Sequence, residues 1–400
     1  MIKKNGFLIL TMSSFLSCTQ NDWEEIPAEN ESINNNNIKS VSASLTRESR
    51  SDRRINEIAF PATHNSYNYS PRFEKSNVFE EMPTQFEKGI RAVEIDIHRK
   101  PKYGLFGSIS GYDTSVFHGQ DSKGINGCRL AHYVLAEITE FLEDNPNEIV
   151  FLKFETTAPS NRLDQEIEEA DLDDHIYNYD PVNNPYPTKQ EIIESGRRCV
   201  ITRHIDGSDY GTSLDRHTFG GGHTSRSDAT PQSSPSNKKY FSVEHYGITS
   251  TFGYGDSDDA KYFQDPSRLG TFVDEVWKLN GKKPWRVIVD FPCVKNNNYY
   301  SVMEDLENQT MLKFEIRRDN GEIFKDWDDG SVKTITWNCQ FGNQNVTAKS
   351  SGEGSFPMKN GETVTLTPTC AGYSFEPASI TITNENTQDY KQVFRVTWNS

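Results

Sequence analysis

The feature that most constrains the fold is an alternation between short apolar segments and helical patterns across residues 51–310. Segments such as "RAVEIDIH" and "EIVFLKFETT" are typical of buried strands, and "LAHYVLAEITEFLEDNP" between them has apolar residues at helical spacing. Repeated strand–helix units form a parallel sheet, and roughly 250 residues is the usual size of a (β/α) barrel. We therefore predict an α/β fold, a TIM-type barrel over residues 51–310, with catalytic side chains at the carboxyl ends of its strands.

The pattern changes after residue 310. The segments "GETVTLTPT", "ASITIT" and "FRVTW" alternate with period two and are separated by Gly, Pro and Asn turns. This predicts a small all-β sandwich domain over residues 311–400. Its last part, "GYSFEPASITITNENTQDYKQVFRV", resembles the final strands of prealbumin-like modules, and such a fold does not by itself assign a function.

The amino terminus has the pattern of an export signal. In "MIKKNGFLILTMSSFLSC" two lysines precede an apolar run that is too short to cross a bilayer. The ending Phe15-Leu16-Ser17-Cys18 resembles a bacterial lipobox, which makes residues 1–17 a lipoprotein signal peptide and Cys18 the lipidated first residue. Polar, Asn-rich residues 18–50 are expected to form a flexible tether. The expected location is the bacterial cell envelope, as an outer-membrane lipoprotein that is surface-exposed, or secreted if ordinary signal cleavage applies instead.

Charge limits the classes of partner. The formal net charge of −16 argues against nucleic acid and against electrostatic adhesion of the chain as a whole to an anionic membrane. We expect membrane attachment through Cys18 and a monomeric chain.

A candidate site begins in the strand "VEIDIH". Successive strand residues point to opposite faces, so Glu94 and Asp96 share one face while the other face is apolar. Two adjacent carboxylates repel, and removing each from water costs several kcal/mol unless a cation compensates. A bound metal is the simplest compensation, although ion pairs inside a barrel would also serve.

Three further segments carry polar residues at predicted strand ends. "PATHNSY" supplies His64 and Asn65, "VFHGQ" supplies His118, and "VFLKFETT" supplies Glu155. Oxygen ligands from one amide and three carboxylates suit a hard cation such as calcium. Two histidines beside it provide an acid–base pair near neutral pH, so we predict metal-assisted phosphoryl transfer.

These strings carry a family resemblance. "PATHNSY", "QFEKGIRAVEIDIH", "VFHGQ" and "NPNEIVFLKFE" are similar to the catalytic X region of phosphatidylinositol-specific phospholipases C, and most similar to the calcium-dependent bacterial branch. The resemblance implies that Ca²⁺ is held by four residues, Asn65, Glu94, Asp96 and Glu155. It also implies an inositol phospholipid substrate, cleaved to diacylglycerol and a cyclic inositol phosphate.

The same resemblance implies catalytic roles. His64 would hydrogen-bond the phosphorane-like transition state, and His118 would protonate the departing diacylglycerol oxygen. A metal-bound carboxylate, Glu94 or Asp96, would take the proton from the inositol 2-hydroxyl as that oxygen attacks phosphorus, and Glu94 is the catalytic candidate.

Two alternatives remain open at this point. Glycerophosphodiester phosphodiesterases and sphingomyelinase D-like enzymes share the barrel and a Glu-x-Asp pair, but they usually begin with His-Arg-Gly, where this chain has His64-Asn65-Ser66. A catalytically inactive surface binding protein is the other alternative.

Overall fold

The fold is known here from a computed structural model. The model describes residues 44–69, 76–103, 109–117, 128–181, 184–215, 218–223, 230–233, 240–245, 256–324, 334–350, 352–385 and 388–399.

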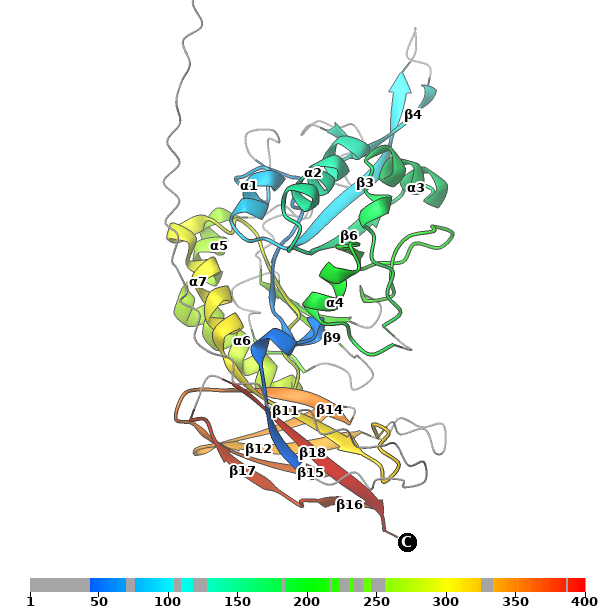
Figure 1. The fold of residues 1–400 in the computed structure, drawn as a ribbon. Helices are drawn as coiled ribbons and strands as arrows, with labels where there is room; N and C mark the ends of the chain where they lie inside the picture. Colours follow the sequence, from blue (N-terminus) through cyan, green and yellow to red (C-terminus); the bar gives the residue numbers. More distant parts are fainter. Residues whose placement is uncertain are drawn as a thin grey trace, which may run out of the picture. The chain divides into compact units, whose positions relative to one another are not determined.

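A nine-stranded sheet forms the α/β region (Figure 1). Its strands are β2 (Phe60–Thr63), β3 (Ala92–Tyr103), β4 (Ile109–Val116), β5 (Arg129–Leu130), β6 (Val150–Thr156), β7 (Cys199–Ile201), β8 (Thr218–His223), β9 (Tyr240–His245) and β10 (Arg286–Val289). Seven of these strands pair in parallel, in the order β7-β6-β3-β2-β10-β9-β8.

This order is that of a rolled barrel, but the sheet is not closed: within the described part of the chain, β7 and β8 do not pair. The prediction of a TIM-type barrel therefore holds only for the mixed α/β class and the parallel strand order. The edge of β7 is covered by other segments, because Tyr177 N donates to Cys199 O at 2.8 Å and Thr212 N donates to Ile201 O at 2.8 Å. These bonds satisfy backbone groups that a closing strand would otherwise satisfy.

Helices flank this sheet. They are α1 (Met82–Glu87), α2 (Ala131–Asp144), α3 (Ser160–Glu169), α4 (Lys189–Glu194), α5 (Ser257–Phe263), α6 (Pro266–Asn280) and α7 (Val294–Asn308). Helix α4 packs through Ile192 on the interior cluster of Ala92 and Phe151. Val93, Ile95 and Ile97 of β3 are buried in one hydrophobic cluster with Leu135 of α2 and Leu163 of α3. The apolar face predicted for "VEIDIH" is thus confirmed.

The all-β region is built from two sheets. One contains β1 (Ser44–Glu48), β18 (Asp389–Trp398), β11 (Thr310–Arg317), β14 (Glu353–Met358) and β16 (Tyr373–Glu376), and the other contains β13 (Gln344–Ser350), β12 (Ile335–Phe341), β15 (Thr363–Thr369) and β17 (Ile380–Thr383). Phe314 and Phe394 of the first sheet share a core with Trp337 and Leu366 of the second. The predicted change to an all-β fold near residue 310 agrees with this arrangement.

The predicted tether extends too far along the chain. Residues 44–48 form β1, which pairs antiparallel with β18. The segment "SLTRE" has too few apolar residues to be recognised as a strand, and its pairing relies on backbone hydrogen bonds to an edge that only the tertiary structure supplies.

A buried ion pair between Arg53 and Asp389 of β18 joins the all-β region to the α/β region. Arg53 donates from Nε and Nη2 to the two carboxylate oxygens of Asp389, at 2.8 and 2.9 Å, and both side chains are fully buried. Arg53 also donates to the carbonyl oxygens of Glu307 and Gln309 at the end of α7. The fork of the guanidinium satisfies three backbone or carboxylate partners at once.

Candidate functional site

The register of β3 and β6 arranges the interior of the α/β region in layers. Ala92 lies opposite Phe151, and both belong to an apolar cluster that includes Trp285. Two residues further along the strands Glu94 lies opposite Lys153, and after another two residues Asp96 lies opposite Glu155. The interior therefore changes from apolar to charged toward the carboxyl ends of the strands, where catalytic residues of such folds gather.

Three of the four predicted metal ligands come together here. Carboxylate oxygens of Glu94, Asp96 and Glu155 all lie within 4.8 Å of one another. Glu94 and Asp96 are buried, whereas the Glu155 side chain is half exposed. Three carboxylates at this spacing repel one another strongly unless a cation lies among them.

The surroundings of Asp96 only partly compensate its buried carboxylate. Its Oδ2 accepts from the Tyr67 hydroxyl at 3.1 Å, while its Oδ1 is buried without a hydrogen-bond partner among the described residues. Burial raises the pKa of Asp96 to about 8, and the carboxylates of Glu94 and Glu155 act in the same direction. A buried carboxylate that keeps an oxygen without a described partner and lies close to two other carboxylates has the environment of a cation ligand.

Lys153 provides part of the missing positive charge. Its Nζ donates to Glu94 Oε1 at 3.0 Å and to Glu155 Oε1 at 3.3 Å. Although burial opposes it, Lys153 lowers the pKa of Glu94 to about 2, with His64 acting in the same direction. Glu94 is therefore held as a carboxylate.

His64 lies in the turn after β2 and is anchored by Asp290, which follows β10. Nδ1 of His64 lies 3.1 Å from Asp290 Oδ1, and this carboxylate oxygen also accepts from Asn77 Nδ2 at 3.2 Å. Although burial lowers the pKa of His64, Asp290 outweighs it and raises the value to about 9. The arrangement favours an imidazolium oriented by a carboxylate.

Asn65 occupies the next position in this turn, with φ +45° in the left-handed region, which asparagine tolerates better than most residues. Its Nδ2 lies 3.2 Å from His64 Nε2 and 3.4 Å from Asn77 Oδ1. Ser66 fixes the turn beside Glu94, because its N–H donates to Glu94 O at 2.9 Å and its Oγ accepts from Glu94 N at 3.1 Å. The turn thus holds Asn65 next to the strand that carries the carboxylates.

The other predicted catalytic histidine, His118, lies outside the described residues. His98, on the same face of β3 as Asp96, is buried beside Phe117 and lies 3.0 Å from Thr157 through Nδ1 and Oγ1. Burial lowers the pKa of His98.

A pocket of about 850 Å³ lies beyond the carboxyl ends of β6 and β7, and Glu94, Asp96 and Glu155 are not among the residues that line it. Thr156, directly after Glu155, lines it together with Tyr179, Arg203 and His204, which follow β6 and β7. This volume is within the range that binds small organic molecules.

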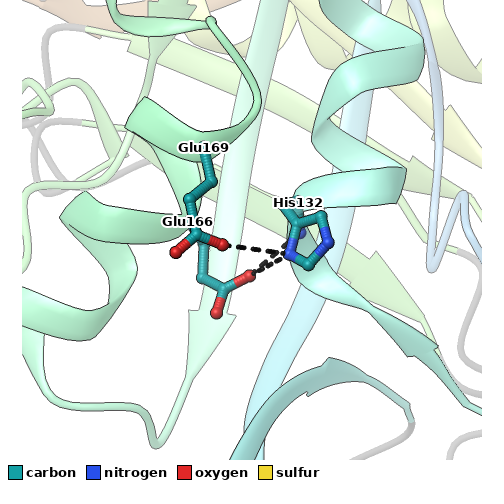
Figure 2. A group of neighbouring side chains, drawn as sticks. All are labelled: His132, Glu166 and Glu169. Atoms are coloured by element: carbon teal, nitrogen blue, oxygen red, sulfur yellow. Dashed lines mark hydrogen bonds and ion pairs between the residues drawn. The ribbon is translucent and has the colours of Figure 1, made fainter.

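A second group of metal-ligating side chains has a structural explanation. His132, Glu166 and Glu169 approach one another between α2 and α3 (Figure 2). Glu166 Oε2 accepts from the His132 backbone N–H at 3.0 Å and lies 2.9 Å from its Nδ1. Glu166 therefore satisfies a backbone donor at the amino end of α2 and connects the two helices.

Several residues of the site were not found by sequence reasoning. Tyr67 belongs to the motif "PATHNSY", but nothing there marks it as a site residue, and Asn77 lies in a segment without a recognisable pattern. Tyr67 hydrogen-bonds Asp96, and Asn77 hydrogen-bonds Asp290. Asp290, at the end of the strand "WRVIVDFP", is a weaker candidate from the sequence, because ordinary structural pairing explains a residue at this position equally well.

The fold and this site define a class: an α/β sheet in barrel order that gathers carboxylates and an anchored histidine at the carboxyl ends of parallel strands. Residues 50–219 match the family model described as PI-PLC X 1, and this segment contains His64, Asn65, Glu94, Asp96, His118 and Glu155. The chain thus contains a segment similar to the X region of phosphatidylinositol-specific phospholipases C.

A comparison with solved structures matches a phosphatidylinositol-specific phospholipase C from Staphylococcus aureus, at 12% identity and a TM-score of 0.41, over 63% of this chain and 94% of that one. PLC21 from L. pealei matches at 13% identity and a TM-score of 0.35, over 86% of this chain and 52% of that one. A comparison with curated proteins finds no match.

Proposed function

We propose that the chain is a calcium-dependent phosphodiesterase that cleaves phosphatidylinositol-type lipids to diacylglycerol and a cyclic inositol phosphate. The observation that carries the proposal is the carboxylate cluster, in which oxygens of Glu94, Asp96 and Glu155 lie within 4.8 Å of one another while Asp96 Oδ1 is buried without a hydrogen-bond partner among the described residues. The match of residues 50–219 to the PI-PLC X model supports the substrate class.

The donor set fits a hard cation. Glu94, Asp96, Glu155 and the Asn65 amide oxygen would hold Ca²⁺, since all four offer oxygen ligands and no sulfur or imidazole competes in this group. When bound, the cation neutralises charge on the phosphate and lowers the pKa of a coordinated hydroxyl.

The side chains of the chain itself then divide the proton transfers. Glu94, kept ionised by Lys153, accepts the proton of the inositol 2-hydroxyl as this oxygen attacks phosphorus. His64, oriented by Asp290, donates a hydrogen bond to a phosphoryl oxygen as negative charge accumulates there. His118 protonates the departing diacylglycerol oxygen.

Membrane attachment completes the proposal. Lipidation of Cys18 would keep the chain at the bacterial outer membrane, close to lipid substrate. No helix among the described residues combines the length and apolarity needed to span a bilayer. Mass spectrometry of the amino-terminal peptide tests the lipid on Cys18.

Phosphorus NMR tests the reaction. The full chain with Cys18→Ser is mixed with phosphatidylinositol micelles, first with calcium and then with a chelator. Cyclic inositol phosphate formed only with calcium is the expected result. Turnover that survives the chelator contradicts the calcium site, and release of glycerol phosphate or of a choline-type leaving group from other lipids contradicts the substrate assignment.

A further inference from the structure

The carboxyl-terminal part of β3 leaves the parallel sheet and forms a two-stranded ribbon with β4. β3 pairs with β6 only as far as Ile97, and among the described strands only β4 accompanies it from there to Tyr103. Figure 1 shows this ribbon, β3 with β4, projecting away from the helices. β3 is buried from Ala92 to His98, whereas Arg99 and Lys102 are exposed.

A β-bulge gives the ribbon two different faces. The register pairs Pro101 with Tyr112 and Tyr103 with Ile109, with a shift between Lys102 and Tyr103. Directly opposed residues share a face, so the shift places Ile109 and Tyr112 on the same face although they are three residues apart. Their exposed fractions are 55% and 46%, unusually high for large apolar side chains.

The other face is basic. Lys100 and Lys102 alternate with Pro101 along β3, and the carboxylate of Asp113 pairs with Lys102. Arg99, on the apolar face, stacks its guanidinium 4.1 Å from the centroid of the Tyr112 ring. The described ribbon therefore carries three cations and one carboxylate in a chain whose formal charge is −16.

These features describe an amphipathic element without a core of its own. A two-stranded ribbon is marginally stable in water, and an isoleucine, a tyrosine and flanking cations are what an interfacial membrane element combines. Long cationic side chains reach headgroups while the apolar residues enter the acyl boundary.

We propose that the β3–β4 ribbon docks on the surface of an anionic lipid bilayer, with Ile109 and Tyr112 entering it. The inference rests on the proposed function, because β3 also carries Asp96 in the carboxylate cluster. At about 3.3 Å per residue, Ile109, opposite Tyr103, lies on the order of 23 Å along the ribbon from Asp96. A docked ribbon would hold the carboxylate cluster at a fixed distance from the bilayer surface that supplies the lipid substrate.

Vesicle co-sedimentation tests the proposal. The full chain with Cys18→Ser, which lacks a lipid anchor, is mixed in chelator with vesicles of phosphatidylcholine containing phosphatidylglycerol. The double variant Ile109→Ser/Tyr112→Ser is expected to lose affinity on the order of tenfold or more. Leu45→Ser and Tyr133→Ser are matched controls, since their side chains are 51% and 60% exposed elsewhere, and both are expected to bind as the parent does.

The readout does not require catalysis, so it separates this inference from the proposed function. Equal binding by the parent and the double variant overturns docking even if phosphatidylinositol is cleaved. If the parent binds vesicles but does not cleave phosphatidylinositol, loss of binding in the double variant still supports docking and contradicts only the proposed enzymatic function. Unchanged circular dichroism and melting temperature show that the double variant is folded. In a separate measurement on Tyr112→Trp, quenching of the tryptophan fluorescence by brominated lipid is the expected sign of insertion. Sedimentation of the parent as a dimer that the double variant abolishes, without vesicle binding, would assign the ribbon to self-association and overturn the proposal.

Discussion

Lys153 and Glu94 form an ion pair inside the candidate site, with Nζ 3.0 Å from Oε1, on neighbouring strands at the same level of the register. The same ammonium lies 3.3 Å from Glu155 Oε1. One cation of the chain thus partly neutralises two of the carboxylates proposed to hold calcium.

Removing this ammonium should tighten calcium binding. In Lys153→Met the three carboxylates keep their negative charge and lose their internal competitor, so we expect calcium affinity to rise roughly tenfold, or about 1.4 kcal/mol. Isothermal titration calorimetry measures the change. Lys189→Met, which removes a half-exposed partner of Glu148, serves as the control. Unchanged or weaker calcium affinity in Lys153→Met would show that the ammonium does not compete for the site.

Asp290 should act by positioning His64. In Asp290→Asn the imidazole loses its carboxylate partner, and we expect kcat on phosphatidylinositol to fall roughly 10²-fold, with calcium affinity unchanged. Steady-state kinetics and calorimetry on the same preparation separate these effects. Asp305→Asn, at an exposed position of α7, is expected to retain the parent kcat. An equal loss of calcium binding in Asp290→Asn would indicate a structural role instead.

The buried pair of Arg53 and Asp389 should be costly to break. Arg53→Met leaves the Asp389 carboxylate buried without its cation, and we expect the free energy of unfolding to fall by about 3–5 kcal/mol. Urea unfolding measures this loss. The double variant Arg53→Met/Asp389→Leu removes both charges and should recover part of it, although Met311 N loses its acceptor on Asp389. A single variant as stable as the parent would refute the assignment.

Lys283 should make stability depend on pH. It is buried and donates to Leu306 O at 2.8 Å, and burial, together with the nearby Arg53, lowers the pKa of Lys283 to about 7 from its ordinary 10.5. Between these two values the unfolded chain binds a proton that the folded chain has lost, so this group adds stability as pH rises through the window and costs most below pH 7.

Lys283→Met should therefore be more stable than the parent at pH 6.5, by about 2 kcal/mol. Its stability should also increase less than that of the parent as the pH rises above 7, because the titrating amine is gone. Urea midpoints at pH 6.5 and pH 9 compare the two proteins. Lys261→Met, at a half-exposed position of α5, is expected to follow the parent curve. Parallel pH curves for Lys283→Met and the parent would contradict the lowered pKa.

Local sequence was sufficient for the two-faced strand at the centre of the site. Alternation in "VEIDIH" predicts an apolar face and an acidic face, and Ile95 and Glu94 lie as the period of two requires, because side-chain direction along a strand is a local property. The strand–helix alternation likewise predicts a parallel sheet, and seven parallel strands are found.

Contacts between segments that are distant in the sequence decided which site residues meet and where β1 is added. His64 and Asp290 are separated by 226 positions, and although a barrel places the first and last strands side by side, no local pattern indicates that these two side chains meet. Nothing in "SLTRE" predicts that β1 will add to the edge of β18. The free energy of such contacts depends on which edges and cavities the completed fold leaves open.

The sequence by itself determined which side chains point inward on β3 and β6, that an all-β region accompanies the α/β region, and which residues are candidates for holding a hard cation. Only the tertiary structure decided that Lys153 lies among the carboxylates. It also decided, over the part of the chain that the structure describes, that Asp96 keeps an oxygen without a hydrogen-bond partner and that β7 and β8 do not pair. The physical reason is that direction along a strand repeats with the backbone, whereas register, edge coverage and charge compensation arise between segments that meet only after folding.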